Sequence, residues 1–135
     1  MLRRSSLWCL GVVLVCGFIA APASRPIAAD ENVPEITVPE LKALLEKEPN
    51  TPIYDVRTPD EYNQGHIKGA ILIPLRELPG RYTEIPQHKK VVVYCMAGGR
   101  SARAVAFLRA HGYDEAVSLA GGYAEWSRSQ SSDSK

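Results

Sequence analysis

Short apolar runs alternate with helical patterns from residue 34 onward. The runs PIYDV, GAILIP and KVVVYC predict strands at 52–56, 69–74 and 90–95, and EAVSLAGG predicts a last strand with its turn at 115–122. The three consecutive valines of KVVVYC do not alternate with polar residues. This pattern indicates a strand that is buried on both faces, as in a parallel sheet.

Helical signals fill the segments between these runs. Two capping boxes, Thr37 with Glu40 and Thr58 with Glu61, mark the first turns of two helices. A further helix is predicted at 101–111, a short helix with an irregular loop at 75–90, and YAEW begins a closing helix. Strands that alternate with helices predict an α/β fold, with a mostly parallel central sheet and helices on both faces.

The first 29 residues have the layout of a secretory signal peptide. A basic start, MLRRSS, precedes an apolar run of 15 residues and a stretch of small residues. The run is shorter than the roughly 20 residues that a membrane-spanning helix needs. We therefore expect cleavage after Ala23 or Ala29, a periplasmic or secreted protein, and no stable membrane insertion afterwards. The alternative is that the segment is retained as an anchor.

Composition narrows the function classes. A chain of 135 residues with 45% hydrophobic residues is sufficient for one domain with a core, expected at 34–128, followed by a disordered tail at 129–135. A net charge of +1 argues against a nucleic-acid-binding surface. The three dispersed histidines lack the spacing of metal ligands, so neither a metal nor a cofactor is expected.

Cleavage of the signal peptide would leave Cys95 as the single cysteine. This residue ends the KVVVYC strand, and the carboxyl edge of an open α/β sheet is where ligands bind. Gly98 and Gly99 permit a sharp turn that brings backbone N–H groups inward, and the next helix directs its positive dipole end to the same point. With the charge of Arg100 beside it, the pattern predicts an activated thiolate in an anion cradle. The competing interpretation is a core cysteine before an ordinary turn.

Three motifs in order resemble those of the single-domain rhodaneses, which are thiosulfate or persulfide sulfurtransferases. They are DVRTPDEYNQGHIKGAILIP, YCMAGGRSARA and LAGGYAEW, and the resemblance covers about residues 34–128. It implies a rhodanese-like fold and a ping-pong sulfur transfer. Cys95 would take a sulfane sulfur from a small anionic donor, thiosulfate or a persulfide, and pass it to a thiophilic acceptor or a protein thiol.

The resemblance also implies roles for the active-site loop. The backbone amides of the loop would hold the persulfide sulfur, and Arg100 would attract the anionic donor. The loop residues concerned are Met96, Ala97, Gly98, Gly99, Arg100 and Ser101. The spacing Cys-x4-Arg is the one that goes with sulfur substrates in this family, whereas phosphatase and arsenate-reductase relatives have one more residue. The alternative function is a non-enzymatic persulfide carrier or partner-binding module.

Other residues of the first motif leave their roles open. Asp55 either orients the loop, pairs with an arginine or caps the following turn, and Arg57 either supports the site at its entrance or is a solvated surface residue. His66 is expected to hold a loop rather than to form a Cys–His dyad, because a thiolate of lowered pKa needs no general base. Glu61 is best explained by helix capping.

Overall fold

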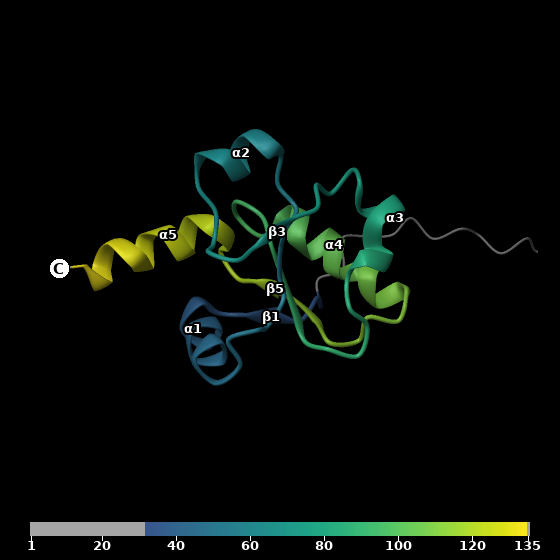
Figure 1. The fold of residues 1–135 in the computed structure, drawn as a ribbon, viewed down its shortest axis with the longest axis horizontal. Helices are drawn as coiled ribbons and strands as arrows, with labels where there is room; N and C mark the ends of the chain where they lie inside the picture. Colours follow the sequence, from purple (N-terminus) through teal and green to yellow (C-terminus); the bar gives the residue numbers. More distant parts are fainter. Residues whose placement is uncertain (1–31, 135) are drawn as a thin grey trace, which may run out of the picture.

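A five-stranded sheet forms the centre of the protein, in a computed structural model that describes residues 32–134 (Figure 1). The expected signal peptide lies outside the described residues. The strands are β1 (Glu35–Ile36), β2 (Ile53–Asp55), β3 (Ile71–Leu72), β4 (Val91–Tyr94) and β5 (Ala116–Leu119). Their order is β1-β5-β4-β2-β3, and every neighbouring pair is parallel. The predicted parallel α/β fold is confirmed.

Helices cover both faces of the sheet (Figure 1). They are α1 (Val38–Lys47), α2 (Pro59–Gln64), α3 (Leu78–Arg81), which a 3-10 turn continues, α4 (Gly99–Ala110) and α5 (Gly122–Asp133). Leu41 of α1 and Trp126 of α5 pack in one apolar cluster with Val92, while α3 and α4 pack on the other face. Both predicted capping boxes are present, at the starts of α1 and α2.

The central strand β4 is buried on both faces, as its consecutive valines predict. Val92 and Tyr94 belong to the cluster under α1 and α5, and Val91 and Val93 belong to the cluster under α3 and α4. All four residues are at most 1% exposed. This rigid strand therefore ends at a fixed point on the carboxyl edge of the sheet, directly before Cys95.

Two features differ from the sequence-based prediction. The two-residue strand β1 pairs with β5, although its sequence is too short to show a strand pattern. The chain beyond residue 128, expected to be disordered, continues α5 through Asp133. One contact ties the end of this segment to α1, where Lys42 forms an ion pair with Asp133.

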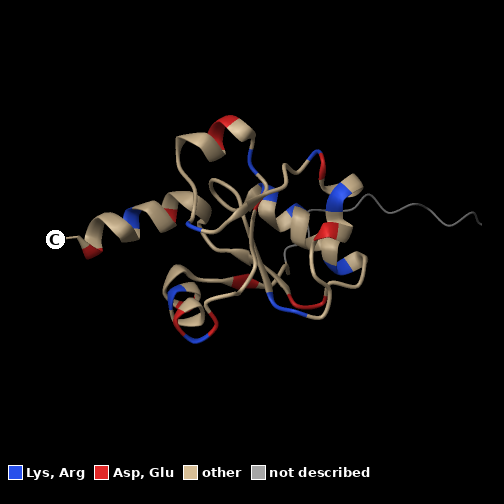
Figure 2. Ribbon diagram, viewed as in Figure 1, with Lys and Arg blue, Asp and Glu red and all other residues tan. Residues whose placement is uncertain are grey.

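Basic and acidic residues alternate along the ribbon in Figure 2, where both kinds occur on α1 and around α3. Within residues 32–134, every helix falls short of the length and apolar character that crossing a membrane requires.

Candidate active site

Cys95 lies where β4 ends, with its side chain almost enclosed. The residue is 2% exposed, whereas Met96, Ala97 and Gly99 in the following loop are exposed. Gly98 has a φ of 112°, which lies in the region that favours glycine, and it caps α4. The helix begins at Gly99, two residues earlier than predicted, so its first amides are closer to the sulfur than the sequence pattern indicates.

Donors of hydrogen bonds surround the sulfur. The Gly98 N–H donates to Cys95 Sγ at 3.1 Å, and Ser101 Oγ lies 3.6 Å from the same atom. The Gly98 carbonyl oxygen lies 3.0 Å from Ser101 Oγ, so the single hydrogen of this hydroxyl can be donated either to the carbonyl or to the sulfur. The structure thus brings two of the predicted loop residues, Gly98 and Ser101, into contact with the sulfur.

A buried serine on β5 supports this group, and sequence reasoning missed it. Ser118 Oγ lies 2.8 Å from Ser101 Oγ, and both side chains are fully buried. A polar residue inside the otherwise apolar strand AVSL was the available signal, because a buried hydroxyl needs a hydrogen-bond partner. Ser118 fixes the position of the Ser101 hydroxyl next to the sulfur.

These contacts lower the pKa of the Cys95 thiol. Burial is the largest single influence and raises the pKa, because it disfavours the charged thiolate. Hydrogen bonds from the Ser101 hydroxyl and from the amides of Ser101, Gly98 and Ala97 act in the opposite direction and together outweigh it. The site therefore favours a thiolate, the nucleophilic form of cysteine.

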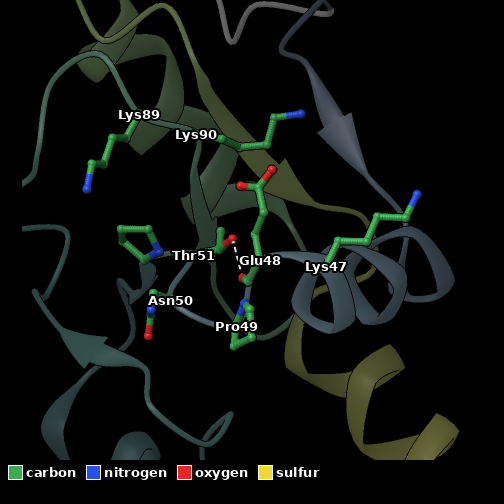
Figure 3. Close-up of a pocket in the computed structure, with 8 residues that line it drawn as sticks. Lys47, Glu48, Pro49, Asn50, Thr51, Lys89 and Lys90 are labelled. Carbon is green, nitrogen blue, oxygen red and sulfur yellow. Dashed lines mark hydrogen bonds between the residues drawn. The ribbon is translucent and has the colours of Figure 1, made fainter.

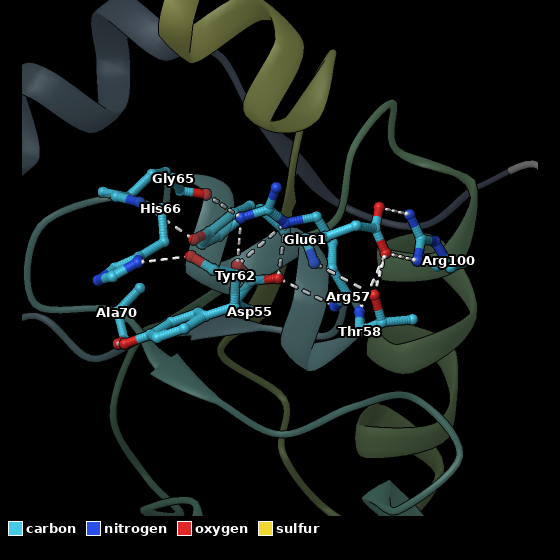
Figure 4. Close-up of polar contacts among 11 residues, drawn as sticks. Asp55, Arg57, Thr58, Glu61, Tyr62, Gly65, His66, Ala70 and Arg100 are labelled. Carbon is cyan, nitrogen blue, oxygen red and sulfur yellow. Dashed lines mark hydrogen bonds and ion pairs between the residues drawn. The ribbon is translucent and has the colours of Figure 1, made fainter.

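The side chain of Arg100 is not unpaired: it forms an ion pair with Glu61 on α2 (Figure 4). Its two terminal nitrogens donate to the two carboxylate oxygens of Glu61 at 2.8 and 2.7 Å. Glu61 also accepts the N–H of Thr58 at 3.0 Å in the capping box. The hydrogen bonds from Arg100, and then those from Thr58, lower the pKa of Glu61 to about 2 against the effect of burial. The predicted capping role of Glu61 is confirmed, and its carboxylate also pairs with Arg100.

Asp55 and Arg57 form a buried ion pair beneath the site (Figure 4). The guanidinium of Arg57 contacts both oxygens of Asp55, at 2.7–3.0 Å, and donates to the Gly65 carbonyl at 2.7 Å. It also lies over the ring of Tyr123, 4.4 Å from the centroid. The interpretation of Arg57 as a solvated arginine is wrong, because it is 1% exposed, whereas its place in the lining of the hollow beside Arg100 agrees with the entrance interpretation. Two of the roles considered for Asp55 are observed: it pairs with Arg57, and its Oδ1 accepts the Arg57 backbone N–H at 2.9 Å, which caps the turn after β2.

His66 holds the end of α2. Its Nδ1 lies 2.9 Å from the Tyr62 carbonyl, and its ring stacks on the Tyr62 ring with centroids 3.7 Å apart. In the part of the chain that the structure describes, the Cys95 sulfur has hydrogen-bond contacts with the backbone N–H of Gly98 and the hydroxyl of Ser101, and none with His66. This geometry agrees with a loop-holding His66 and not with a Cys–His dyad.

Two hollows lie at opposite ends of the sheet. One adjoins Arg100 and is lined by the turn after β2 and the loop after β3; its residues are Val56, Arg57, Thr58, Pro59, Asp60, Pro74, Leu75, Arg76 and Arg100. The other is lined by 47–52 with Lys89 and Lys90, at the amino ends of β2 and β4 (Figure 3). Only the first lies at the carboxyl edge, beside the loop that carries Cys95. Within residues 32–134, no three His, Cys, Asp or Glu side chains are grouped to hold a metal ion.

Known proteins share this sequence and this architecture. A sulfurtransferase of Allochromatium vinosum is 38% identical over 96 residues, which cover 71% of this chain and 90% of that protein. The thiosulfate sulfurtransferase PspE of Escherichia coli is 46% identical over 70 residues, or 50% of this chain and 66% of that protein. The structure of the human single-domain sulfurtransferase TSTD1 matches with a TM-score of 0.64 and 31% identity, covering 72% of this chain and 97% of that one. The profile of the rhodanese-like domain matches residues 37–129, and the chain therefore belongs to the rhodanese-like family.

Proposed function

We propose that this rhodanese-family sulfurtransferase takes a sulfane sulfur from thiosulfate or a persulfide and carries it as a persulfide on Cys95. A thiophilic acceptor, such as cyanide, sulfite or a protein thiol, then removes the sulfur. The observation that supports this proposal is the sulfur atom of Cys95, which is enclosed by N–H and O–H donors that lower the pKa of its thiol.

Sulfur transfer takes place in two displacement steps. The Cys95 thiolate attacks the outer sulfur of thiosulfate, the S–S bond of thiosulfate breaks, and sulfite leaves with the electron pair of that bond. The acceptor then attacks the outer persulfide sulfur, and the S–S electrons return to Cys95 as thiolate. Amides preorganised around the sulfur stabilise the negative charge in both steps without reorganisation.

Intact-mass measurement after treatment with thiosulfate tests the proposal. We expect the mass to increase by one sulfur atom, and peptide mapping to place this atom on Cys95. Cyanide should then remove it with formation of thiocyanate. A protein that gains no sulfur from thiosulfate or from a persulfide donor would contradict the proposal.

A second candidate is a carrier that passes sulfur to one partner protein. Met96, adjacent to Cys95, is 37% exposed, and a large apolar side chain beside the reactive atom suits contact with a protein surface. Slow turnover with cyanide, together with fast transfer to one protein thiol, would favour the carrier. Rapid turnover with thiosulfate and cyanide would favour the enzyme.

We further propose that the protein acts outside the cytoplasm, in the periplasm or after secretion. The support is the basic, apolar and small-residue order of residues 1–29. N-terminal sequencing of the protein from its native host should give Ser24 or Asp30 as the first residue. An intact N-terminus in the membrane fraction would instead support the retained anchor.

A further inference from the structure

The start of α5 is hydrogen-bonded to the active-site loop through backbone groups. The Tyr123 N–H donates to the Cys95 carbonyl at 2.8 Å, and the Ala124 N–H donates to the Met96 carbonyl at 3.0 Å. These amides belong to the first turn of a helix, where N–H groups have no partner within the helix. Two successive carbonyls of the loop are therefore held on the side that faces α5.

Fixing these carbonyls also fixes the direction of the amides that follow them. In a planar trans peptide, the C=O and N–H of one peptide unit point in opposite directions. Because the Met96 carbonyl points to α5, the Ala97 N–H of the same peptide points away from α5. The next amide along the chain, that of Gly98, donates to Cys95 Sγ at 3.1 Å, so the held peptide units lead directly into the hydrogen bond on the sulfur. The amides of both Ala97 and Gly98 lower the pKa of Cys95.

Gly122 is the residue that permits this contact. Its φ is 59°, and a Cβ placed on it would lie 2.5 Å from the Cys95 carbonyl oxygen and 2.7 Å from that of Met96. Both contacts are with backbone, which has no flexible end that can move aside. The preceding Gly121 differs, because a Cβ there would meet the side chain of Glu125 within the same helix.

The start of α5 is itself anchored to the buried ion pair. The Tyr123 ring lies under the guanidinium of Arg57, and its centroid is 6.3 Å from that of the Tyr94 ring. The Tyr123 hydroxyl lies so close to Gly65 that a Cβ placed on Gly65 would be 2.5 Å from the hydroxyl oxygen. The two amides that hold the loop thus belong to a fixed support rather than to a freely moving helix end.

We propose that the first turn of α5, with Gly122 as the residue that allows close approach, is a positioning element for sulfur transfer. It binds the carbonyls of Cys95 and Met96 and so fixes the two peptide units that lead to the Gly98 N–H on the sulfur. This inference rests on the proposed function only in taking Cys95 as the sulfur acceptor.

Replacement of Gly122 by alanine tests the inference. The readout is the rate at which iodoacetamide alkylates the Cys95 peptide of the full chain, followed by mass spectrometry over a range of pH. In Gly122→Ala, we expect the midpoint of this profile to rise by about one pH unit, as the loss of a hydrogen bond to a charged sulfur implies. The kcat/KM for thiosulfate should fall at neutral pH, whereas kcat should recover in part at higher pH.

Gly112→Ala is the matched control. Gly112 also has a positive φ, 87°, but a Cβ there would meet only Gln87 Nε2, at the ordinary distance of 3.5 Å. This variant has similar backbone strain but no contact with the loop, so the alkylation midpoint should stay at the wild-type value. Equal midpoints in Gly122→Ala, Gly112→Ala and the wild type would overturn the inference.

Ala124→Pro provides a second variant in case Gly122→Ala fails to fold. Proline has no N–H, and the first turn of a helix tolerates it better than the interior does. The Met96 carbonyl would lose its donor, and the midpoint should rise as in Gly122→Ala. If the folded Ala124→Pro protein alkylates with the wild-type pH profile, the inference is wrong. Alkylation does not require transfer, so failure of the proposed function would appear separately, as the absence of a persulfide on a normally reactive Cys95.

Discussion

The ion pair between Arg100 and Glu61 gives the most specific prediction about the sulfur donor. If Arg100 attracts an anionic donor, Glu61 opposes this attraction, because its carboxylate is bound to the same guanidinium at 2.7–2.8 Å. The Glu61→Gln variant removes the negative charge. It keeps the helix cap, because glutamine serves in a capping box as glutamate does. We therefore expect Glu61→Gln to increase the use of thiosulfate and Arg100→Ala to decrease it.

The size of the effect follows from the exposure of the pair. The side chains of Arg100 and Glu61 are 34% and 24% exposed, so the screening of bulk water, with a dielectric constant of about 80, sets the lower limit of the effect. A dianion about 6 Å from an unpaired guanidinium then gains about 1–2 kcal/mol. This energy corresponds to roughly five- to thirtyfold in kcat/KM, upward for Glu61→Gln and downward for Arg100→Ala. The double variant restores a neutral site and should be close to the wild type.

Steady-state kinetics with thiosulfate and cyanide measures these changes, and methanethiosulfonate is the control donor. This donor carries one negative charge instead of two, so each effect on kcat/KM should shrink to roughly two- to fivefold. Added salt should reduce the gain in Glu61→Gln, because it screens exposed charges. Arg81→Ala is the matched protein control. Arg81, like Arg100, is paired with acidic side chains, in this case Glu77 and Glu84, but it does not line the hollow at Arg100.

The reasoning is refuted if Glu61→Gln leaves the kcat/KM for thiosulfate unchanged or lowers it while the protein remains folded. The same holds if thiosulfate and methanethiosulfonate respond equally to Arg100→Ala. In either case Arg100 would act by holding α2 to the loop rather than through its charge.

Three further predictions concern the sulfur and the two ion pairs. Cys95→Ser should abolish persulfide formation with an unchanged thermal melting curve, because serine fits the same space but forms no persulfide; retained transfer would exclude Cys95 as the acceptor. Arg57→Ala should lower the free energy of unfolding, measured by urea titration, by about 3–5 kcal/mol, because the buried carboxylate of Asp55 loses its partner. A loss below about 1 kcal/mol, as expected for a solvated arginine, would contradict this. Because the pKa of Glu61 is lowered from 4.5 to about 2, its stabilising effect is present above pH 4.5 and is lost as the pH falls toward 2. As the pH falls from 4.5 to 2, the free energy of unfolding of the wild type should therefore decrease by about 1–2 kcal/mol more than that of Glu61→Gln; this figure is reduced because the pair is partly exposed to solvent. If the two proteins have parallel profiles of unfolding free energy against pH, the ion pair does not stabilise the fold.

Local patterns in the sequence determined the elements and the place of the reactive residue. The capping boxes at Thr37 and Thr58 depend on residues three positions apart, and the burial of β4 is visible in consecutive valines. The position of Cys95 at the carboxyl edge follows from the end of that strand and the glycine turn after it. Signals of this kind act over a few residues, so they can be recognised without the fold.

The tertiary structure alone decided which side chains meet. Glu61 and Arg100 are 39 positions apart, and Ser101 and Ser118 are 17 apart, so their contacts depend on the strand order β1-β5-β4-β2-β3. The same order brings the first turn of α5 against the carbonyl of Cys95. Arg57 was open to two interpretations in the sequence, because an arginine is solvated unless the fold encloses it together with an acidic partner. Strand order and enclosure arise from the whole chain packing around one core, and no local period or cap in the sequence specifies them.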